Sequence, residues 1–404
     1  MIGKHKSIRG GVAAAQGFRA TGTACGIKKT GKPDLALIAS DTPAAAAAVF
    51  TTNRVVAAPI VWTRQVLRRP ELRAVIVNSG NANACTGDQG LLDARRVAEV
   101  TACALGTKAN HIAVSSTGVI GQPLPTERIL QAVPALARRL SRAGSSQAAL
   151  AILTTDTCPK SRAVELTTGG KRVRVGGIAK GSGMIHPDMA TMLAFITTDA
   201  AVSPSLLKKA LKEAVDLSFH RITVDGDTST NDMVLMMANG ASAASISEKN
   251  RISSRFQDAL NAVCLDLAQA IVMDGEGATK FVTIRVVNGR DEKTALAIAK
   301  KIAQSSLVKT ALFGEDANWG RILSAAGNAG VPIRPEWVDI YFDRVQLVKE
   351  GIVRGGDQEK RATKILQKRT LTITVDLNLG SASSEVYTSD LSIDYVKINA
   401  DYRS

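Results

Sequence analysis

Near the middle of the chain, the segment Lys180-Gly-Ser-Gly-Met-Ile-His-Pro-Asp-Met-Ala-Thr191 leads through flexible residues to an Ala-Thr junction, and an apolar run follows. A threonine hydroxyl is a poor nucleophile until a base stands beside it. The α-amine of the same residue becomes such a base once the preceding peptide bond is broken, because an amino terminus has a pKa of about 7.7–8.0. Cleavage between Ala190 and Thr191 would therefore create the nucleophile and its base together. The same Met-Ala-Thr-Met-Leu run is also typical of a buried core.

The sequence lacks the motifs of several other kinds of catalytic site. There is no G-x-S-x-G nucleophile elbow, and the glycine-rich stretch from Gly176 to Gly183 matches neither the P-loop nor the dinucleotide-binding fingerprint. We expect no metal site, because the four histidines lie far apart without ligand spacing: His5, His111, His186 and His220.

The net charge of +15 is confined to the first half of the chain. Residues 1–190 hold 25 Lys and Arg against 10 Asp and Glu, whereas residues 191–404 hold 26 of each kind. The basic residues are spread singly or in pairs, without interleaved aromatic residues. This pattern favours attraction of small anions over a nucleic-acid-binding role, which remains the alternative from a different class.

Length and composition predict an α/β protein of two or three lobes. The 404 residues are 45% hydrophobic but only 4% aromatic, so the core is built mainly from small aliphatic side chains. The five cysteines are scattered without a C-x-x-C pair, which is typical of reduced thiols. With no apolar run of about 18 residues, we expect a soluble cytoplasmic protein.

Periodicity and capping residues predict the elements that position these groups. Ala74–Val77 and Ile112–Ser116 are predicted strands that end in the polar loops Asn78–Asn83 and Thr117-Gly118, where α/β proteins place binding sites. Ser203-Pro204 predicts a helix start. The same patterns predict a helix over 254–273, and strands over 150–153, 338–342, 371–376 and 391–398.

The chain resembles the ornithine acetyltransferase/glutamate N-acetyltransferase family of arginine biosynthesis, which are self-processing enzymes with an N-terminal threonine nucleophile. The matching blocks run nearly from end to end: Gly26–Ile38, Val49–Asn53, Asn78–Asn83, Ser115–Gly121, Thr154–Thr157, Met189–Leu193, Asp225–Asp232, Phe313–Arg321 and Ile398–Ser404. One departure is Asp188, where the family commonly has Asn, and it adds a negative charge beside the expected cut.

The resemblance implies a layered αββα-type sandwich of the self-processing N-terminal-nucleophile kind, with a smaller C-terminal α/β lobe from about residue 285. It also implies an α chain, 1–190, and a β chain, 191–404, which assemble as α2β2. Thr191 would attack the carbonyl carbon of Ala190, and hydrolysis would then free the two chains. In the mature enzyme Thr191 would take the acetyl group from N-acetylornithine and pass it to glutamate in a ping-pong cycle.

The family's site residues map onto positions of this sequence. The oxyanion donors would be the Thr117 hydroxyl and the Gly118 backbone N–H. Substrate contacts would come from Thr154, Lys180, Thr191, Glu276, Asn399 and Ser404. In simpler alternatives, Thr117-Gly118 is an ordinary turn, Lys180 and Glu276 are solvated surface charges, and the last six residues are a frayed tail.

The resemblance implies no cofactor, and it leaves open whether acetyl-CoA is a second acetyl donor. Because the family shares its nucleophile geometry with amide hydrolases, the closest rival function is a self-processing aminopeptidase or amidase. The two functions differ in whether an amine or water takes the acyl group.

Overall fold

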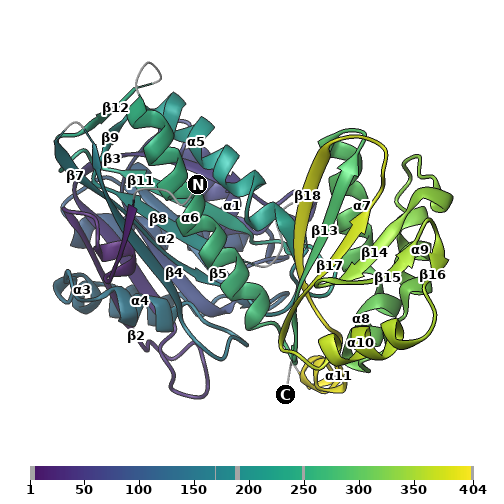
Figure 1. The fold of residues 1–404 in the computed structure, drawn as a ribbon. Helices are drawn as coiled ribbons and strands as arrows, with labels where there is room; N and C mark the ends of the chain where they lie inside the picture. The colour runs from purple at the N-terminus through teal and green to yellow at the C-terminus, as the bar shows by residue number, and fades with distance from the viewer. Residues whose placement is uncertain (1–4, 169, 187–191, 248–250, 402–404) are drawn as a thin grey trace. The chain divides into compact units, whose positions relative to one another are not determined.

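The computed structural model describes residues 5–168, 170–186, 192–247 and 251–401, and the chain forms two compact units (Figure 1). The larger unit comprises Met1–Gly181, Asp188–His220 and Thr228–Ile271, and the smaller comprises Ser182–Pro187, Arg221–Asp227 and Val272–Ser404. These units differ from the predicted cleavage products, which would divide at residue 190. That division stays a prediction.

In its described part, the larger unit is built on a nine-stranded sheet with the order β1-β6-β7-β8-β11-β3-β4-β5, and β2 pairs with β3. The strands are β1 (His5–Ile8), β2 (Phe18–Thr23), β3 (Leu35–Phe50), β4 (Glu71–Asn81), β5 (Ile112–Val119), β6 (Lys160–Thr168), β7 (Lys171–Lys180), β8 (Leu193–Thr198) and β11 (Met233–Ala238). A separate small pair joins β9 (Ala201–Val202) and β12 (Ser245–Ile246). The helices are α1 (Ala58–Val66), α2 (Gly87–Ala104), α3 (Thr126–Arg138), α4 (Ser145–Ala151), α5 (Pro204–Asp216) and α6 (Arg251–Met273).

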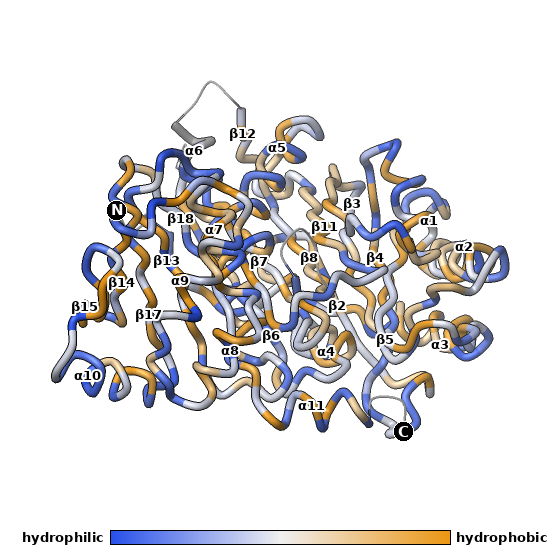
Figure 2. The backbone as a smooth tube through the Cα atoms, turned by 90° about the vertical axis from the view of Figure 1, so that its right-hand side faces the viewer, coloured by the Kyte–Doolittle hydropathy of each residue, from blue (hydrophilic) through white to orange (hydrophobic). Residues whose placement is uncertain are grey.

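Burial on both faces of the central strands explains the layers of this unit. Ala36 and Ile38 of β3 join a core that also contains Phe195 of β8 and Leu235 of β11, so strands contribute to this core from distant parts of the sheet. Leu35, Leu37 and Ala39 point the other way and pack with α2 and α3. Helix α6 packs on β7, and Figure 1 shows α5 beside α6. The strands are therefore sandwiched between helices, and their hydrophobic colouring in Figure 2 reflects this double burial.

The smaller unit has its own sheet, with the order β10-β18-β13-β17-β14-β15-β16, and its own apolar core. Its strands are β10 (Ile222–Thr223), β13 (Phe281–Gly289), β14 (Asp339–Phe342), β15 (Val345–Lys349), β16 (Ile352–Val353), β17 (Thr370–Asp376) and β18 (Ala382–Ser389). Its helices are α7 (Glu292–Gln304), α8 (Ser306–Phe313), α9 (Trp319–Gly327), α10 (Asp357–Leu366) and α11 (Ile393–Ala400).

The predicted α/β class, with a second α/β unit towards the C-terminus, is confirmed. The start of α5 is confirmed as well, because Ser203 Oγ accepts the Leu206 N–H at 3.4 Å and Pro204 is the first helical residue. The predicted helix over 254–273 corresponds to α6, and the predicted strands over 338–342 and 371–376 correspond to β14 and β17.

Two predicted strands are wrong. The strand predicted over 150–153 does not form, because the preceding run of alanines forms α4, in which Ala148, Ala149 and Ala151 are buried. Alanine has the highest helix propensity, and that preference outweighs the short apolar run. Residues 393–398 of that predicted strand lie in α11 instead, because the Ser392 side chain caps the helix by accepting the Tyr395 N–H at 3.3 Å.

Candidate active site

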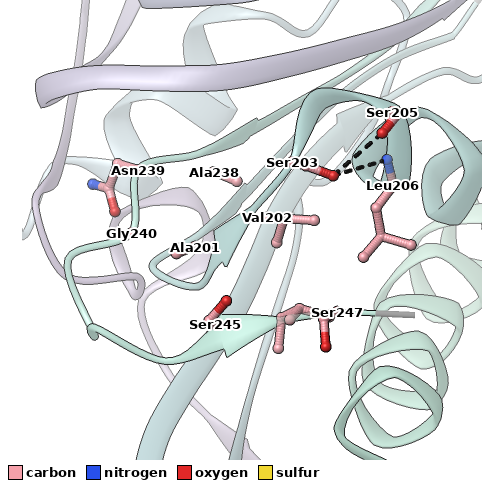
Figure 3. A pocket seen from close by; sticks show the side chains of 11 residues that line it. Ala201, Val202, Ser203, Ser205, Leu206, Ala238, Asn239, Gly240, Ser245 and Ser247 are labelled. Carbon is pink, nitrogen blue, oxygen red and sulfur yellow. Dashed lines mark hydrogen bonds between the residues drawn. The ribbon is translucent and has the colours of Figure 1, made fainter. Parts of the chain in front are cut away.

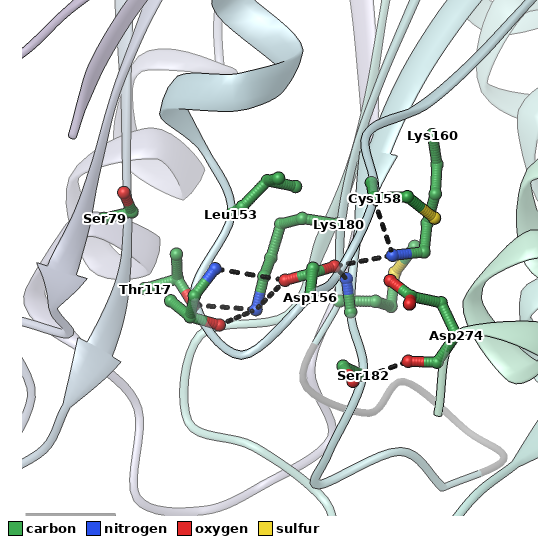
Figure 4. A network of polar contacts seen from close by, with 12 residues as sticks. Ser79, Thr117, Leu153, Asp156, Cys158, Lys160, Lys180, Ser182 and Asp274 are labelled. Atoms are coloured by element: carbon green, nitrogen blue, oxygen red, sulfur yellow. Dashed lines mark hydrogen bonds and ion pairs between the residues drawn. The ribbon is translucent and has the colours of Figure 1, made fainter. Parts of the chain in front are cut away.

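Three of the predicted site residues meet in the larger unit. Lys180 is the last residue of β7, and its Nζ donates to Thr154 Oγ1 at 2.8 Å and to Thr117 Oγ1 at 3.4 Å (Figure 4). The Lys180 residue is only 1% exposed. The alternative that Lys180 is a solvated surface charge is therefore wrong.

Asp156 is a member of this cluster that the sequence motifs did not single out. Its carboxylate contacts Lys160 Nζ at 2.8 Å and Lys180 Nζ at 3.8 Å, and it accepts the Gly181 N–H at 2.7 Å. Burial opposes ionisation of Asp156, but the two ammonium groups and the N–H donor outweigh it and hold the pKa below its usual range. The four-residue spacing of Asp156 and Lys160 gave no usable signal in the sequence, because such spacing brings side chains together on a helix and residues 152–159 form none.

Lys28, from the Gly26–Ile38 block, supports the loop that carries Thr154. Its Nζ donates to the backbone oxygens of Leu153 at 2.7 Å and Pro33 at 2.8 Å. Burial lowers the Lys28 pKa to about 8, and the nearby Lys180 charge acts in the same direction. Lys28 thus fixes the backbone immediately before Thr154.

The residue after Thr117 must be glycine. Gly118 has a φ of 132°, and a Cβ there would overlap the backbone of Gly80 in the neighbouring strand β4. Gly80 and Gly118 are register partners in the parallel pairing of β4 with β5. Because this close approach fixes the backbone at residue 118, the predicted oxyanion donors Thr117 and Gly118 lie on a rigid strand end.

Asparagine side chains tie the polar loops together. Asn231 Nδ2 donates to the backbone oxygens of Ala82 at 2.7 Å and Ser116 at 2.9 Å. Ser116 Oγ in turn donates to Asn78 Oδ1 at 2.5 Å. Three blocks that are distant in the sequence are thus held together around the residue before Thr117.

The proposed nucleophile Thr191, with Ala190, lies outside the described residues. The next residue, Met192, is described, and its N–H donates to Asp232 Oδ1 at 2.9 Å. Asp232 is 1% exposed, and burial raises its pKa well above the usual value, although the Met192 N–H and the Lys180 charge oppose this.

A second group of predicted residues lies in the smaller unit. Glu276 follows α6 and is 7% exposed, so the alternative that it is a solvated surface charge is wrong. Its Oε2 accepts a hydrogen bond from Asn399 Nδ2 of α11 at 2.8 Å. A Cβ at Gly183 would overlap the Glu276 carboxylate, so the segment from residue 182 passes directly over this group. Ser404 lies outside the described residues.

The same segment is fixed by Asp225. Its carboxylate accepts the Met184 N–H at 2.5 Å and the Ile185 N–H at 2.8 Å. Burial raises the Asp225 pKa to about 6, against the effect of these donors. The Asp225–Asp232 block therefore contributes residues to both units: Asp225 belongs to the smaller and Asp232 to the larger.

Other candidate sites coincide with none of the predicted residues. A pocket of about 720 Å³ opens beside the start of α5 and the small pair of β9 and β12, and residues such as Val202, Ser203 and Ser245 line it (Figure 3). Among the described residues, no three His, Cys, Asp or Glu side chains gather in a metal-binding arrangement. Within that same part of the chain, no helix is both long and apolar enough to cross a membrane.

Comparison with known proteins finds relatives over nearly the whole chain. The sequence model of the ArgJ family matches residues 19–404. The arginine biosynthesis bifunctional protein ArgJ of Geobacter sulfurreducens is 52% identical over 390 residues, covering 96% of this chain and 99% of the relative. Its counterpart in Symbiobacterium thermophilum is 49% identical over 400 residues, covering 98% and 99%.

Among solved structures, ornithine acetyltransferase from Mycobacterium tuberculosis, crystallised with ornithine, is 45% identical with a TM-score of 0.43, covering 45% of this chain and 98% of that one. The family match spans most of the chain, and the relatives match it over nearly their whole length. The chain therefore belongs to the ArgJ family, as its sequence motifs predicted.

Proposed function

We propose that the chain cuts itself between Ala190 and Thr191 and then transfers an acetyl group from N-acetylornithine to glutamate. Thr191 is the nucleophile, and its freed α-amine takes the hydroxyl proton. The acetyl-threonine ester then passes its acetyl group to the amine of glutamate. Atoms are conserved in each half-reaction, with ornithine leaving first and N-acetylglutamate second.

The observation that carries this proposal is the convergence of Lys180, Thr154 and Thr117 in one buried cluster. Thr117 and the adjacent Gly118 supply a hydroxyl and a backbone N–H on a rigid strand end, which suits oxyanion binding. Lys180 offers its charge to a substrate carboxylate. Membership of a family whose relatives are named as arginine biosynthesis proteins supports the choice of substrates.

Glu276 and Asn399 complete the substrate contacts in this proposal. The Glu276 carboxylate is the partner for the ammonium group of ornithine, and Asn399 orients it through the 2.8 Å hydrogen bond. Ser404 is a further proposed contact. The products of cleavage, 1–190 and 191–404, remain together as an α2β2 assembly in the cytoplasm.

Acetyl-CoA is a second acetyl donor in this proposal. The relatives are named as bifunctional proteins, which supports a second activity at the same nucleophile. No metal or other cofactor is needed for acyl transfer by an N-terminal threonine.

The mass of the purified protein under denaturing conditions tests the first step. Two fragments that separate between Ala190 and Thr191 are expected, and Thr191→Ala should leave one intact chain. A wild-type chain of full length would contradict the whole mechanism.

Incubation with N-acetylornithine and labelled glutamate tests the second step. Labelled N-acetylglutamate and free ornithine are expected in equal amounts. Release of acetate without acetylglutamate would favour the amidase instead. Salt-dependent DNA binding without acyl chemistry would favour the nucleic-acid-binding alternative.

A further inference from the structure

Self-cleavage needs a base that the mature enzyme does not need. Before the cut, the nitrogen of Thr191 is an amide nitrogen and cannot take a proton from the Thr191 hydroxyl. The α-amine that would serve as base in every later turnover does not yet exist. A different group must therefore accept the hydroxyl proton in the precursor.

Asp232 has the burial and the available oxygen atom that such a group requires. Its Oδ1 accepts the Met192 N–H at 2.9 Å, while its Oδ2 is buried and accepts no hydrogen bond from the described residues. Buried polar atoms without partners are rare in folded proteins, and each calls for an explanation. This one belongs to a residue that is 1% exposed.

The position of Asp232 is fixed relative to the cut. Its neighbour Met233 begins β11, which pairs in parallel with β8, and Met233 N–H donates back to the Met192 oxygen at 3.2 Å. Met192 follows Thr191 directly, so bond lengths alone keep the Thr191 hydroxyl within about 5 Å of the Met192 nitrogen. Asp232 is thus hydrogen-bonded to the residue that directly follows the proposed nucleophile in the chain.

We propose that Asp232 is the base of self-cleavage and uses its Oδ2 atom, an inference that rests on the proposed function. Oδ2 takes the proton of the Thr191 hydroxyl as Thr191 Oγ bonds to the Ala190 carbonyl carbon. The Ala190–Thr191 C–N bond breaks, and the proton passes from Asp232 to the departing nitrogen. Water then hydrolyses the ester, which leaves the Ala190 carboxylate, the Thr191 hydroxyl and a free amine.

The surroundings of Asp232 suit repeated gain and loss of a proton. Burial raises its pKa, whereas the Met192 N–H, the Lys180 charge from β7 and the nearby Ser229 lower it. A carboxyl group with a raised pKa is a stronger base than an ordinary aspartate. Lys180 is a poorer candidate, because its ammonium group already contacts the Asp156 carboxylate and donates to Thr154.

Asp232→Asn is the direct test. The amide oxygen can still accept the Met192 N–H, and a neutral side chain suits a buried site, so the variant should fold with an unchanged melting temperature. Freshly synthesised precursor should then be cut about 100-fold more slowly than the wild type, or slower still. Cleavage is followed by denaturing mass measurement over time.

Asp199→Asn is the matched control. Asp199 follows the far end of β8, is 2% exposed, and accepts the Gln16 and Arg174 N–H groups, both at 2.9 Å. It should be cut at the wild-type rate. Normal cleavage of Asp232→Asn, or equal slowing of both variants, would overturn the assignment to Asp232.

The pH dependence of wild-type cleavage gives a measurement that does not depend on a variant. The rate should fall in acid with a midpoint above about 3.9, the ordinary pKa of aspartate. A rate that stays constant from about pH 7 down to pH 4 would overturn the proposal. A wild-type chain that is never cut between Ala190 and Thr191 would contradict the proposed function itself. A wild-type chain that is cut, together with normal cutting of Asp232→Asn, would contradict only the role of Asp232.

Discussion

Lys180 Nζ donates to Thr154 Oγ1 at 2.8 Å, in a buried cluster that also holds Asp156 and Lys160. Both ammonium groups contact the Asp156 carboxylate, and all three side chains are at most 2% exposed. A buried ammonium group beside the Thr154 and Thr117 hydroxyls can form a charge-assisted hydrogen bond with a carboxylate. In the proposed function, Lys180 binds the substrate carboxylate in this way.

Replacement of Lys180 by methionine should therefore weaken substrate binding. A hydrogen bond to a charged group contributes about 1.5–3 kcal/mol, so KM for the amino-acid substrates should rise by roughly 10- to 150-fold. Lys171→Met is the control, because Lys171 lies at the exposed end of the same strand and donates to the Ala243 oxygen. Equal kinetic effects of the two replacements would contradict the binding role.

Thr117→Val should slow acetyl transfer by about 100- to 1000-fold, the usual effect of removing one oxyanion donor. The loss should appear mainly in kcat, because the oxyanion forms only in the transition state. Thr117→Ser keeps the hydroxyl and should retain most of the activity. Equal loss of activity in the valine and serine variants would contradict the role of the hydroxyl as an oxyanion donor. It would show instead that activity depends on the shape of the Thr117 side chain.

Glu276→Gln should raise KM for N-acetylornithine by roughly 10-fold or more, because the amide cannot offer a charge to the substrate ammonium group. Asn399→Leu should produce a smaller rise, since it removes the hydrogen bond that orients Glu276. Asp394→Asn is the control on the same helix, where Asp394 is exposed and contacts Lys397. Steady-state kinetics with each substrate varied separately would show whether the effect is confined to the donor.

The depressed pKa of Asp156 predicts how stability depends on pH. A carboxyl group whose folded-state pKa is lowered adds stability above its unfolded pKa of about 3.9, and loses it as the pH falls through the folded value. Asp156→Asn should cost about 3–5 kcal/mol near neutral pH, because it removes the carboxylate that both buried ammonium groups contact. Melting temperatures of both proteins should converge as the solution is made more acidic. A constant difference down to about pH 2 would contradict this assignment.

The sequence predicted the apolar parts of β4 and β5 but ended both strands too early, because the small polar residues that follow resemble a loop: β4 continues to Asn81 and β5 to Val119. Ile112–Ser116 followed by Thr117-Gly118 corresponds to β5 and its end. The motifs also identified Lys180, Thr154 and Thr117 as members of one site, and the structure brings these three together. Their predicted chemistry is what the substitutions at Lys180 and Thr117 test.

The sequence analysis did not single out Asp156 and Asp232, because their roles depend on contacts with residues that are distant in the sequence. Nothing in the Thr154–Thr157 block shows that Asp156 faces Lys180 across 24 positions, and nothing near Asp232 shows that it accepts the Met192 N–H. The wrong strand over 391–398 has a local cause, since its β-branched residues concealed the helix cap at Ser392. Tertiary pairing and capping therefore account for what the sequence patterns could not supply.

The strand order of the nine-stranded sheet determines how the two fragments of the proposed cut would stay together. Strands β8 and β11 come after residue 191, yet they lie side by side in the middle of the sheet, between β7 and β3 from before the cut. Each of the two backbone hydrogen-bond ladders, β7 with β8 and β3 with β11, would then pair one strand from each fragment. The fragments would be complementary parts of one folded body, and neither could leave without opening the sheet on both sides. Cleavage would thus leave the architecture of the unit unchanged.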